Sequence, residues 1–132
     1  MDICWEEAVR RGDGDVVQDL IARGIDLDAR DRHGQSGLML AAHAGHLGVV
    51  QILIDGGADL NMTAKDGLSA LMLAVVAGHQ EIARALVRAG ADVTLRGTGA
   101  PGFAGKTAAD LATARGWREV VKGKMDFKAE GK

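Results

Sequence analysis

Residues 31–63 read DRHGQSGLMLAAHAGHLGVVQILIDGGADLNMT, and residues 64–96 read AKDGLSALMLAVVAGHQEIARALVRAGADVTLR. Aligned with each other, the two stretches share residues at a step of 33 positions, and the step extends back toward the start of the chain. The repeating columns are Gly12, Gly45 and Gly78; Gly24, Gly57 and Gly90; Gly34 and Gly67; His46 and His79; and Ala58-Asp59 and Ala91-Asp92. Several independent columns at one spacing indicate a repeat protein, in which each unit is one small structural motif.

Each unit carries the signals of two short helices. Ser36, Ser69 and Thr107 stand before apolar runs, where a side-chain oxygen can accept hydrogen bonds from the unpaired amides of a helix start. In LGVVQILID (47–55) and EIARALVRA (81–89), apolar residues recur at i, i+3 and i+4, and a glycine follows directly. No unit buries its apolar stripe alone, so the units are expected to stack.

At these residues the chain resembles the ankyrin repeat family. The matching positions are Gly34, Leu38, Ala41, Ala42, Gly45, His46, Val49, Val50, Leu53, Gly57, Ala58 and Asp59, and in the next unit Gly67, Leu71, Ala74, Gly78, His79, Glu81, Ile82, Leu86, Gly90, Ala91 and Asp92. The resemblance implies an all-α solenoid of stacked helix-turn-helix units with short hairpin loops. It departs from the family at the start of the first helices, where SGLM, SALM and TAAD replace Thr-Pro-Leu-His and methionine takes the place of histidine.

The step of 33 divides the chain into units within one predicted domain of 132 residues. The predicted units are about 1–30 (a cap), 31–63, 64–96 and 97–125 (a cap with a five-residue insertion), and residues 126–132 form a tail. Trp5 aligns with Leu38 and Leu71, and we expect it to fill the core of the first unit. Cys4 aligns with the starts of the later first helices, and we expect a buried structural thiol there.

Composition narrows the class of protein. The chain is 47% apolar and 26% charged, its net charge is -2 and its pI is about 6.0, so binding to nucleic acid or to an acidic membrane is not expected. The single cysteine allows no internal disulfide, and no stretch has the ~18 apolar residues of a membrane span. These features predict a cytoplasmic protein.

The stretch GAPGFAGKT (99–107) satisfies the looser form of a phosphate-binding loop, with alanine for the first glycine. Such a loop needs a buried strand before it and a later strand that delivers an acid to magnesium. Only 25 residues follow Thr107, and Thr107 falls in the column of Ser36 and Ser69 once the insertion is allowed for. We therefore predict a helix cap, no enzyme and no cofactor. The alternative is a small nucleotide- or phosphate-responsive protein that uses Ala100–Thr107.

Two other groups of residues in the sequence could suggest a metal site or an acid-base pair. His33, His43 and His46 are histidines close in sequence, but His46 belongs to a repeat column, so we predict a structural role and no metal. Asp26 and Asp28 resemble the repeat-exit residues Asp59 and Asp92, so no carboxylate pair for acid-base catalysis is predicted.

The resemblance implies that a partner protein binds on the concave face, at the hairpin tips and the exposed ends of the first helices. There, Leu68, Val76 and Ala77 give an apolar centre flanked by arginines, which is typical of a protein-binding patch. The alternative is that these are ordinary scattered surface residues. Phe103, in the insertion, either packs on the last unit or projects as an anchor. The predicted partner-binding residues are Arg10, Arg11, Arg32, His33, Gln35, His43, Lys65, Asp66, Leu68, Val76, Ala77, Phe103 and Arg115.

The predicted function is thus a protein-protein interaction module that acts as inhibitor, adaptor or chaperone and is monomeric when unbound. A third possibility is a structural subunit of a homo-oligomer, which a concentration-dependent mass in solution would reveal.

Overall fold

The computed structural model describes residues 2–98 and 104–117. Within these residues the chain forms seven α-helices and no β-strand, which confirms the predicted all-α repeat fold. The helices are α1 (Ile3–Arg11), α2 (Gly14–Ala22), α3 (Gly37–Ala44), α4 (Leu47–Asp55), α5 (Ala70–Ala77), α6 (Gln80–Arg88) and α7 (Ala108–Ala114). The insertion residue Phe103 and the predicted tail 126–132 lie outside the described residues.

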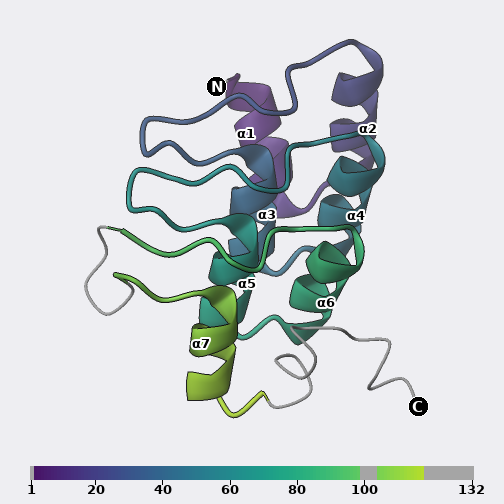
Figure 1. Ribbon diagram of the computed structural model, residues 1–132. Helices are drawn as coiled ribbons and strands as arrows, with labels where there is room; N and C mark the ends of the chain where they lie inside the picture. Colours follow the sequence, from purple (N-terminus) through teal and green to yellow (C-terminus); the bar gives the residue numbers. More distant parts are fainter. Residues whose placement is uncertain (1, 99–103, 118–132) are drawn as a thin grey trace.

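The helices form two layers (Figure 1). One layer contains α1, α3, α5 and α7, each packed against the next, and the other contains α2, α4 and α6. The loops that lead into α3 and α5 project to one side as hairpins, and the described residues on either side of the loop into α7 extend the same way. The repeat therefore places equivalent residues of successive units in parallel rows, one row for each position in the unit.

The predicted helix caps are confirmed. The hydroxyl oxygens of Ser36 and Ser69 accept hydrogen bonds from the amides of Met39 at 3.4 Å and Met72 at 3.3 Å. Thr107 accepts one from the amide of Asp110 at 3.1 Å and begins α7 in the same way. Each cap satisfies an amide that the helix itself leaves unpaired.

Glycine ends the first helices for two reasons. Gly12 and Gly45 adopt the left-handed region, with φ of 76° and 89°, which L side chains rarely enter. A Cβ atom on Gly12 would also lie 2.6 Å from Nδ1 of His46, and one on Gly45 would lie 2.7 Å from Cε1 of His79. Each glycine thus leaves room for the histidine ring of the next unit.

Trp5 occupies the core of the first unit, as predicted, with no exposed surface. Its indole ring lies over Gly37, because a Cβ atom added there would be 3.0 Å from Nε1 of Trp5. Met39 and Met72 are each 1% exposed, so the methionines that replace histidine contribute to apolar packing. The unusual glycine at the start of α3 is therefore explained by the bulk of the tryptophan.

Cys4 is exposed, so the prediction of a buried thiol is wrong. The equivalent residue of α3, Gly37, is covered by Trp5 from the preceding unit.

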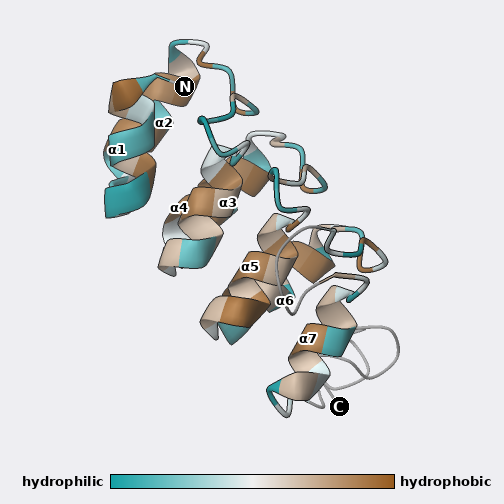
Figure 2. Cartoon of the chain, turned by 90° about the vertical axis from the view of Figure 1, so that its left-hand side faces the viewer, coloured by the Kyte–Doolittle hydropathy of each residue, from teal (hydrophilic) through white to brown (hydrophobic). Residues whose placement is uncertain are grey.

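Apolar residues concentrate on the helices of both layers, α5 above all, and the hairpin loops are more hydrophilic (Figure 2). None of the described helices combines the length and the apolar character that crossing a membrane requires.

Candidate functional site

The hairpin loops are held to one another by hydrogen bonds. The Lys65 amide donates to the His33 carbonyl at 3.1 Å. The Nη1 atom of Arg30 donates to the carbonyls of Gly34 at 2.9 Å and Thr63 at 2.7 Å, so it joins its own hairpin to the next. Arg30 and the backbone therefore connect the hairpins of successive units.

Two aspartate side chains accept hydrogen bonds from backbone amides of the hairpin tips. The Oδ1 atom of Asp31 accepts the amides of His33 and Gln35, each at 2.9 Å, and only 7% of its side chain is exposed. Oδ1 of Asp66 accepts the amide of Leu68 at 3.1 Å. Both acids are therefore engaged by the backbone of their own turn.

The predicted tip residues differ in exposure. Arg32, His33 and Lys65 are exposed, and Gln35 and Asp66 are half-buried.

Leu68 is only 4% exposed, so its assignment to an exposed apolar centre is wrong. The same position in the preceding hairpin, Gln35, is half-buried, and in the following one, Lys106, it is exposed. An apolar side chain at this position is stabilised by turning inward onto the core, which removes it from water.

The predicted binding residues at the C-terminal ends of the first helices form a row, with arginines in the first and last units of the chain. Arg10 pairs with Glu6 at 3.0 Å and lies 3.8 Å from Asp31, so it connects α1 to the first hairpin. At the other end, the Arg115 guanidinium lies 5.7 Å from the centre of the Trp117 ring, within cation-π range. Arg11 is exposed at the last turn of α1.

Between these ends the row is built from small and half-buried residues. His43 and Ala44 are exposed at the end of α3, and Ala77 is half-buried at the end of α5. Val76 is also half-buried and packs against the hydrophobic core. Of the predicted apolar centre, Val76 and Ala77 are thus half-buried, and the exposed Ala44 stands in the same repeat column as Ala77.

His46 and His79 have structural positions. Their Nε2 atoms lie 2.8 Å from the Arg10 carbonyl and 3.1 Å from the His43 carbonyl, and since a carbonyl only accepts, each ring donates. Each histidine thus ties its unit to the end of the preceding first helix. Among the described residues, no group of three or more potential ligands is placed to hold a metal ion.

The loop that resembled a phosphate site contains a capping box. Thr107 and Asp110 exchange hydrogen bonds, with the Thr107 amide donating to the Asp110 carboxylate at 3.0 Å. That backbone bond is the main reason why the pKa of Asp110 lies below its usual value. Lys106 is exposed, and Ala100 and Phe103 fall outside the described residues. The hydroxyl that would have to bind magnesium caps a helix of 7 residues.

A second hydrogen-bonded row lies at the exits of the second helices. The Asp59 amide donates to Asp28 at 2.9 Å, and the Asp92 amide donates to Asn61 at 2.7 Å. Within the last exit loop, the hydroxyl and amide of Thr94 both donate to Asp92, and they hold the pKa of Asp92 below its usual value. The exit acids therefore have structural partners, as their repeat columns indicated.

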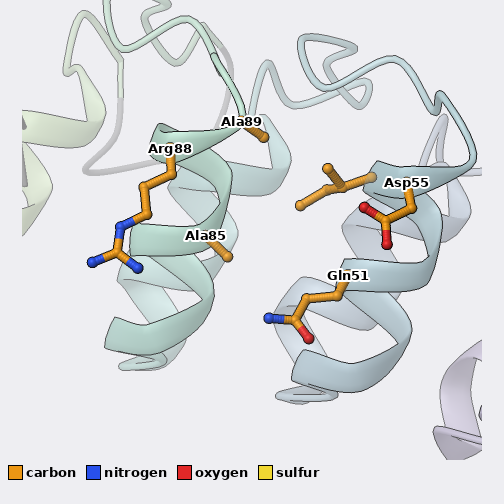
Figure 3. Close-up of a pocket in the computed structure, with 6 residues that line it drawn as sticks. Gln51, Asp55, Ala85, Arg88 and Ala89 are labelled. Atoms are coloured by element: carbon orange, nitrogen blue, oxygen red, sulfur yellow. The ribbon is translucent and has the colours of Figure 1, made fainter.

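Two surface hollows between the second helices were not predicted. One, of about 420 Å³, is lined by Gln51, Ile54, Asp55, Ala85, Arg88 and Ala89. Figure 3 shows Ala85 of α6 and Ala89, the residue that follows α6, facing α4, while the Arg88 guanidinium extends away from it.

The other hollow, of about 350 Å³, is lined by Gln18, Ile21, Ala22, Ile52, Asp55 and Gly56. Each of these residues lies 33 positions before a lining residue of the first hollow, for example 51 - 18 and 85 - 52. The hollows are thus one feature repeated by the stacking of units, and no local sequence signal marks them.

A family model described as ankyrin repeats (3 copies) matches residues 5–97, which include all of the helices from α2 to α6 and most of α1. No curated protein matches the chain.

Proposed function

Because the chain belongs to the ankyrin repeat family, whose members generally serve as protein-protein interaction modules, we propose that it binds a partner protein on its concave face. In this proposal the protein is non-catalytic and acts as an inhibitor, adaptor or chaperone of that partner. The face comprises the hairpin tips, with Arg32, His33 and Lys65, and the ends of the first helices, with Arg11 and His43.

The observation that carries the proposal is that exposed side chains of one face are mounted on a backbone held by hydrogen bonds between units. The Lys65 amide bonds to His33, Arg30 bonds to Thr63, and His79 bonds to the His43 carbonyl. A surface that is ordered before binding loses less conformational entropy when a partner docks, and more of the contact energy then appears as affinity.

The test is quantitative partner capture from a lysate of cells that express the protein. The first variant carries Ala44→Glu and Ala77→Glu, which place charge in the middle of the row at the helix ends. The matched control carries Ala85→Glu on α6 and Ala89→Glu directly after it, beside the hollow between the second helices. Far-UV circular dichroism and thermal melts establish that both variants fold.

A protein that the native chain and the control retain, and the first variant loses, supports binding at this face. Retention by the first variant together with loss by the control places the partner on the other side and contradicts the proposal. Equal retention by all chains contradicts it as well.

A further inference from the structure

The three hairpin segments have a charge opposite in sign to that of the whole chain. Together the hairpins contain five cations and two carboxylates, a net charge of +3 (5 - 2), whereas the chain carries -2. The first hairpin is residues 29–36, the second is 62–69, and the described residues of the third are 95–98 and 104–107. The cations are Arg30, Arg32, Lys65, Arg96 and Lys106, and the carboxylates are Asp31 and Asp66.

All five cations are exposed, but they differ in their hydrogen bonds within the chain. Arg30 donates to Gly34 and Thr63, and Arg96 donates to the Gly105 carbonyl at 2.6 Å, so the backbone holds both side chains in place. The other three, which we call the tip cations, form no ion pair within the described residues. The tip cations are Arg32, Lys65 and Lys106.

The carboxylates of the hairpins do not neutralise the tip cations. Asp31 accepts two amides and faces Arg10, and Asp66 accepts the amide of Leu68. The Asp31 carboxylate therefore faces into its own turn, Asp66 is half-buried, and the cations of the hairpins outnumber their carboxylates.

The backbone that carries the tip cations is held in place. Lys65 bonds through its amide to His33, the residue after Arg32, so the first two tip cations occupy neighbouring hairpins in fixed register. The Lys106 carbonyl accepts the Gly97 amide at 3.0 Å, which holds the third hairpin closed next to the cation. Figure 1 shows the hairpins stacked along one side of the molecule.

We propose that the tip cations bind an acidic, extended segment of the partner protein that runs along the stack and presents a carboxylate at every third residue. The inference rests on the proposed function and specifies the chemistry of the partner. Arg32 and Lys65 occupy the same position of successive hairpins, whereas Lys106 takes the position of Gln35 and Leu68 in the third hairpin. Packed helices are separated by about 8–10 Å, which sets the step from Arg32 to Lys65. A polyproline II segment advances about 3.1 Å per residue and repeats every three residues, so its like-facing side chains are about 9 Å apart.

The charge distribution favours an acidic protein segment over nucleic acid. The exit loops carry Asp26, Asp28, Asp59 and Asp92, which repel a large polyanion that extends beyond the tips. Duplex DNA presents a charge about every 1.7 Å, far denser than one cation for each hairpin. Aromatic residues make up only 3% of the chain, which leaves little surface for stacking bases.

The test uses a fluorescent synthetic peptide with glutamate at every third position, each followed by proline, and measures its binding by fluorescence anisotropy. Two control peptides have glutamine in place of glutamate, or the same composition with all glutamates adjacent. The full chain is compared with an Arg32→Gln, Lys65→Gln variant, a Lys106→Gln variant and an Arg23→Gln, Arg88→Gln variant. The last removes two cations from the second-helix side and is the matched control for charge.

We expect the spaced peptide to bind best and to weaken as salt rises. Each tip cation removed should weaken binding by up to about five-fold, as for an exposed ion pair, and the second-helix control should bind as the native chain does. If the peptide with adjacent glutamates binds as tightly as the spaced peptide, the proposed spacing of carboxylates is wrong. If the Arg23→Gln, Arg88→Gln variant loses as much affinity as the tip-cation variants, the proposed site is wrong. Stronger binding of single-stranded RNA than of any peptide overturns the choice of partner.

The inference and the proposed function fail in distinguishable ways. If no peptide binds, but the native chain still captures a protein that the Ala44→Glu, Ala77→Glu variant loses, the acidic segment is wrong and the binding face stands. If the spaced peptide binds through the tip cations and no partner depends on the helix ends, the row at the helix ends is not part of the face.

Discussion

Two helical glycines of this chain should respond in opposite ways to the same substitution. Gly37 begins α3 beneath the Trp5 ring, whereas Gly48 lies in α4 with no atom within 4 Å of the position of its missing Cβ. Alanine is favoured over glycine in a helix by up to about 1 kcal/mol. Gly48→Ala should therefore increase the free energy of unfolding by about 0.5–1 kcal/mol.

At Gly37 the added methyl group would lie 3.0 Å from Nε1 of Trp5 and 3.3 Å from its Cε2. These separations are tight, and Trp5 has no exposed surface through which the ring could move outward. Overpacking of a filled core typically costs about 1–3 kcal/mol, which exceeds the gain in helix propensity. Gly37→Ala should therefore lower the free energy of unfolding by about 1 kcal/mol, giving a difference of about 2 kcal/mol from Gly48→Ala.

The assay is urea unfolding followed by far-UV circular dichroism, carried out on each alanine variant with Trp5 present and with Trp5→Leu. Leucine is the residue that α3 and α5 carry in the same column, at Leu38 and Leu71. With Trp5→Leu, Gly37→Ala should become neutral or stabilising, while the effect of Gly48→Ala should not change. A stabilisation by Gly37→Ala equal to that by Gly48→Ala, with Trp5 present, would refute the packing argument.

Three more outcomes are expected. Gly45→Ala should lower the free energy of unfolding, measured in urea, more than Gly57→Ala does. Both glycines have positive φ, but only Gly45 faces a ring, that of His79. Equal losses of stability in the two variants would contradict this. The pKa of Asp110 is lower in the folded state than in the unfolded state, so its ionised form stabilises the fold above the unfolded-state pKa, and this stabilisation is lost as the pH falls through the folded-state pKa. Asp110→Asn should therefore reduce the fall in melting temperature over this acidic range. A melting temperature that depends on pH as in the native chain would contradict this. Magnesium ATP should leave the melting temperature unchanged, whereas a ligand at 100 times its Kd would add ~2.7 kcal/mol.

Local signals predicted the helices and their limits. Ser36, Ser69 and Thr107 each cap a helix, as their place before an apolar run indicated. Such signals are readable because a cap bonds to an amide three residues away, and that geometry is the same in any fold. The burial of Trp5 also followed from sequence, because the repeat column placed it beside two core leucines.

The candidate site was predicted less completely. Arg32, His33, Lys65 and His43 are exposed on the elements where the repeat columns put them, whereas Leu68 is buried. A repeat column fixes the backbone position of a residue but leaves open whether its side chain turns to water or to the core. For Leu68 the balance of packing against hydration decides the direction, and that balance depends on neighbouring units.

The sequence by itself determined the repeat, the helix pairs, their caps and the order of the units, because each of these depends on residues within one unit or on a fixed step along the chain. Tertiary structure alone decided which charges are available and where the surface is hollow. Arg30 and Arg10 each contact a neighbouring hairpin, while Arg32 forms no ion pair within the described residues, although all three are exposed arginines. The difference arises because an ion pair or a gap between helices forms from atoms of two units, and their approach is fixed only when the units stack.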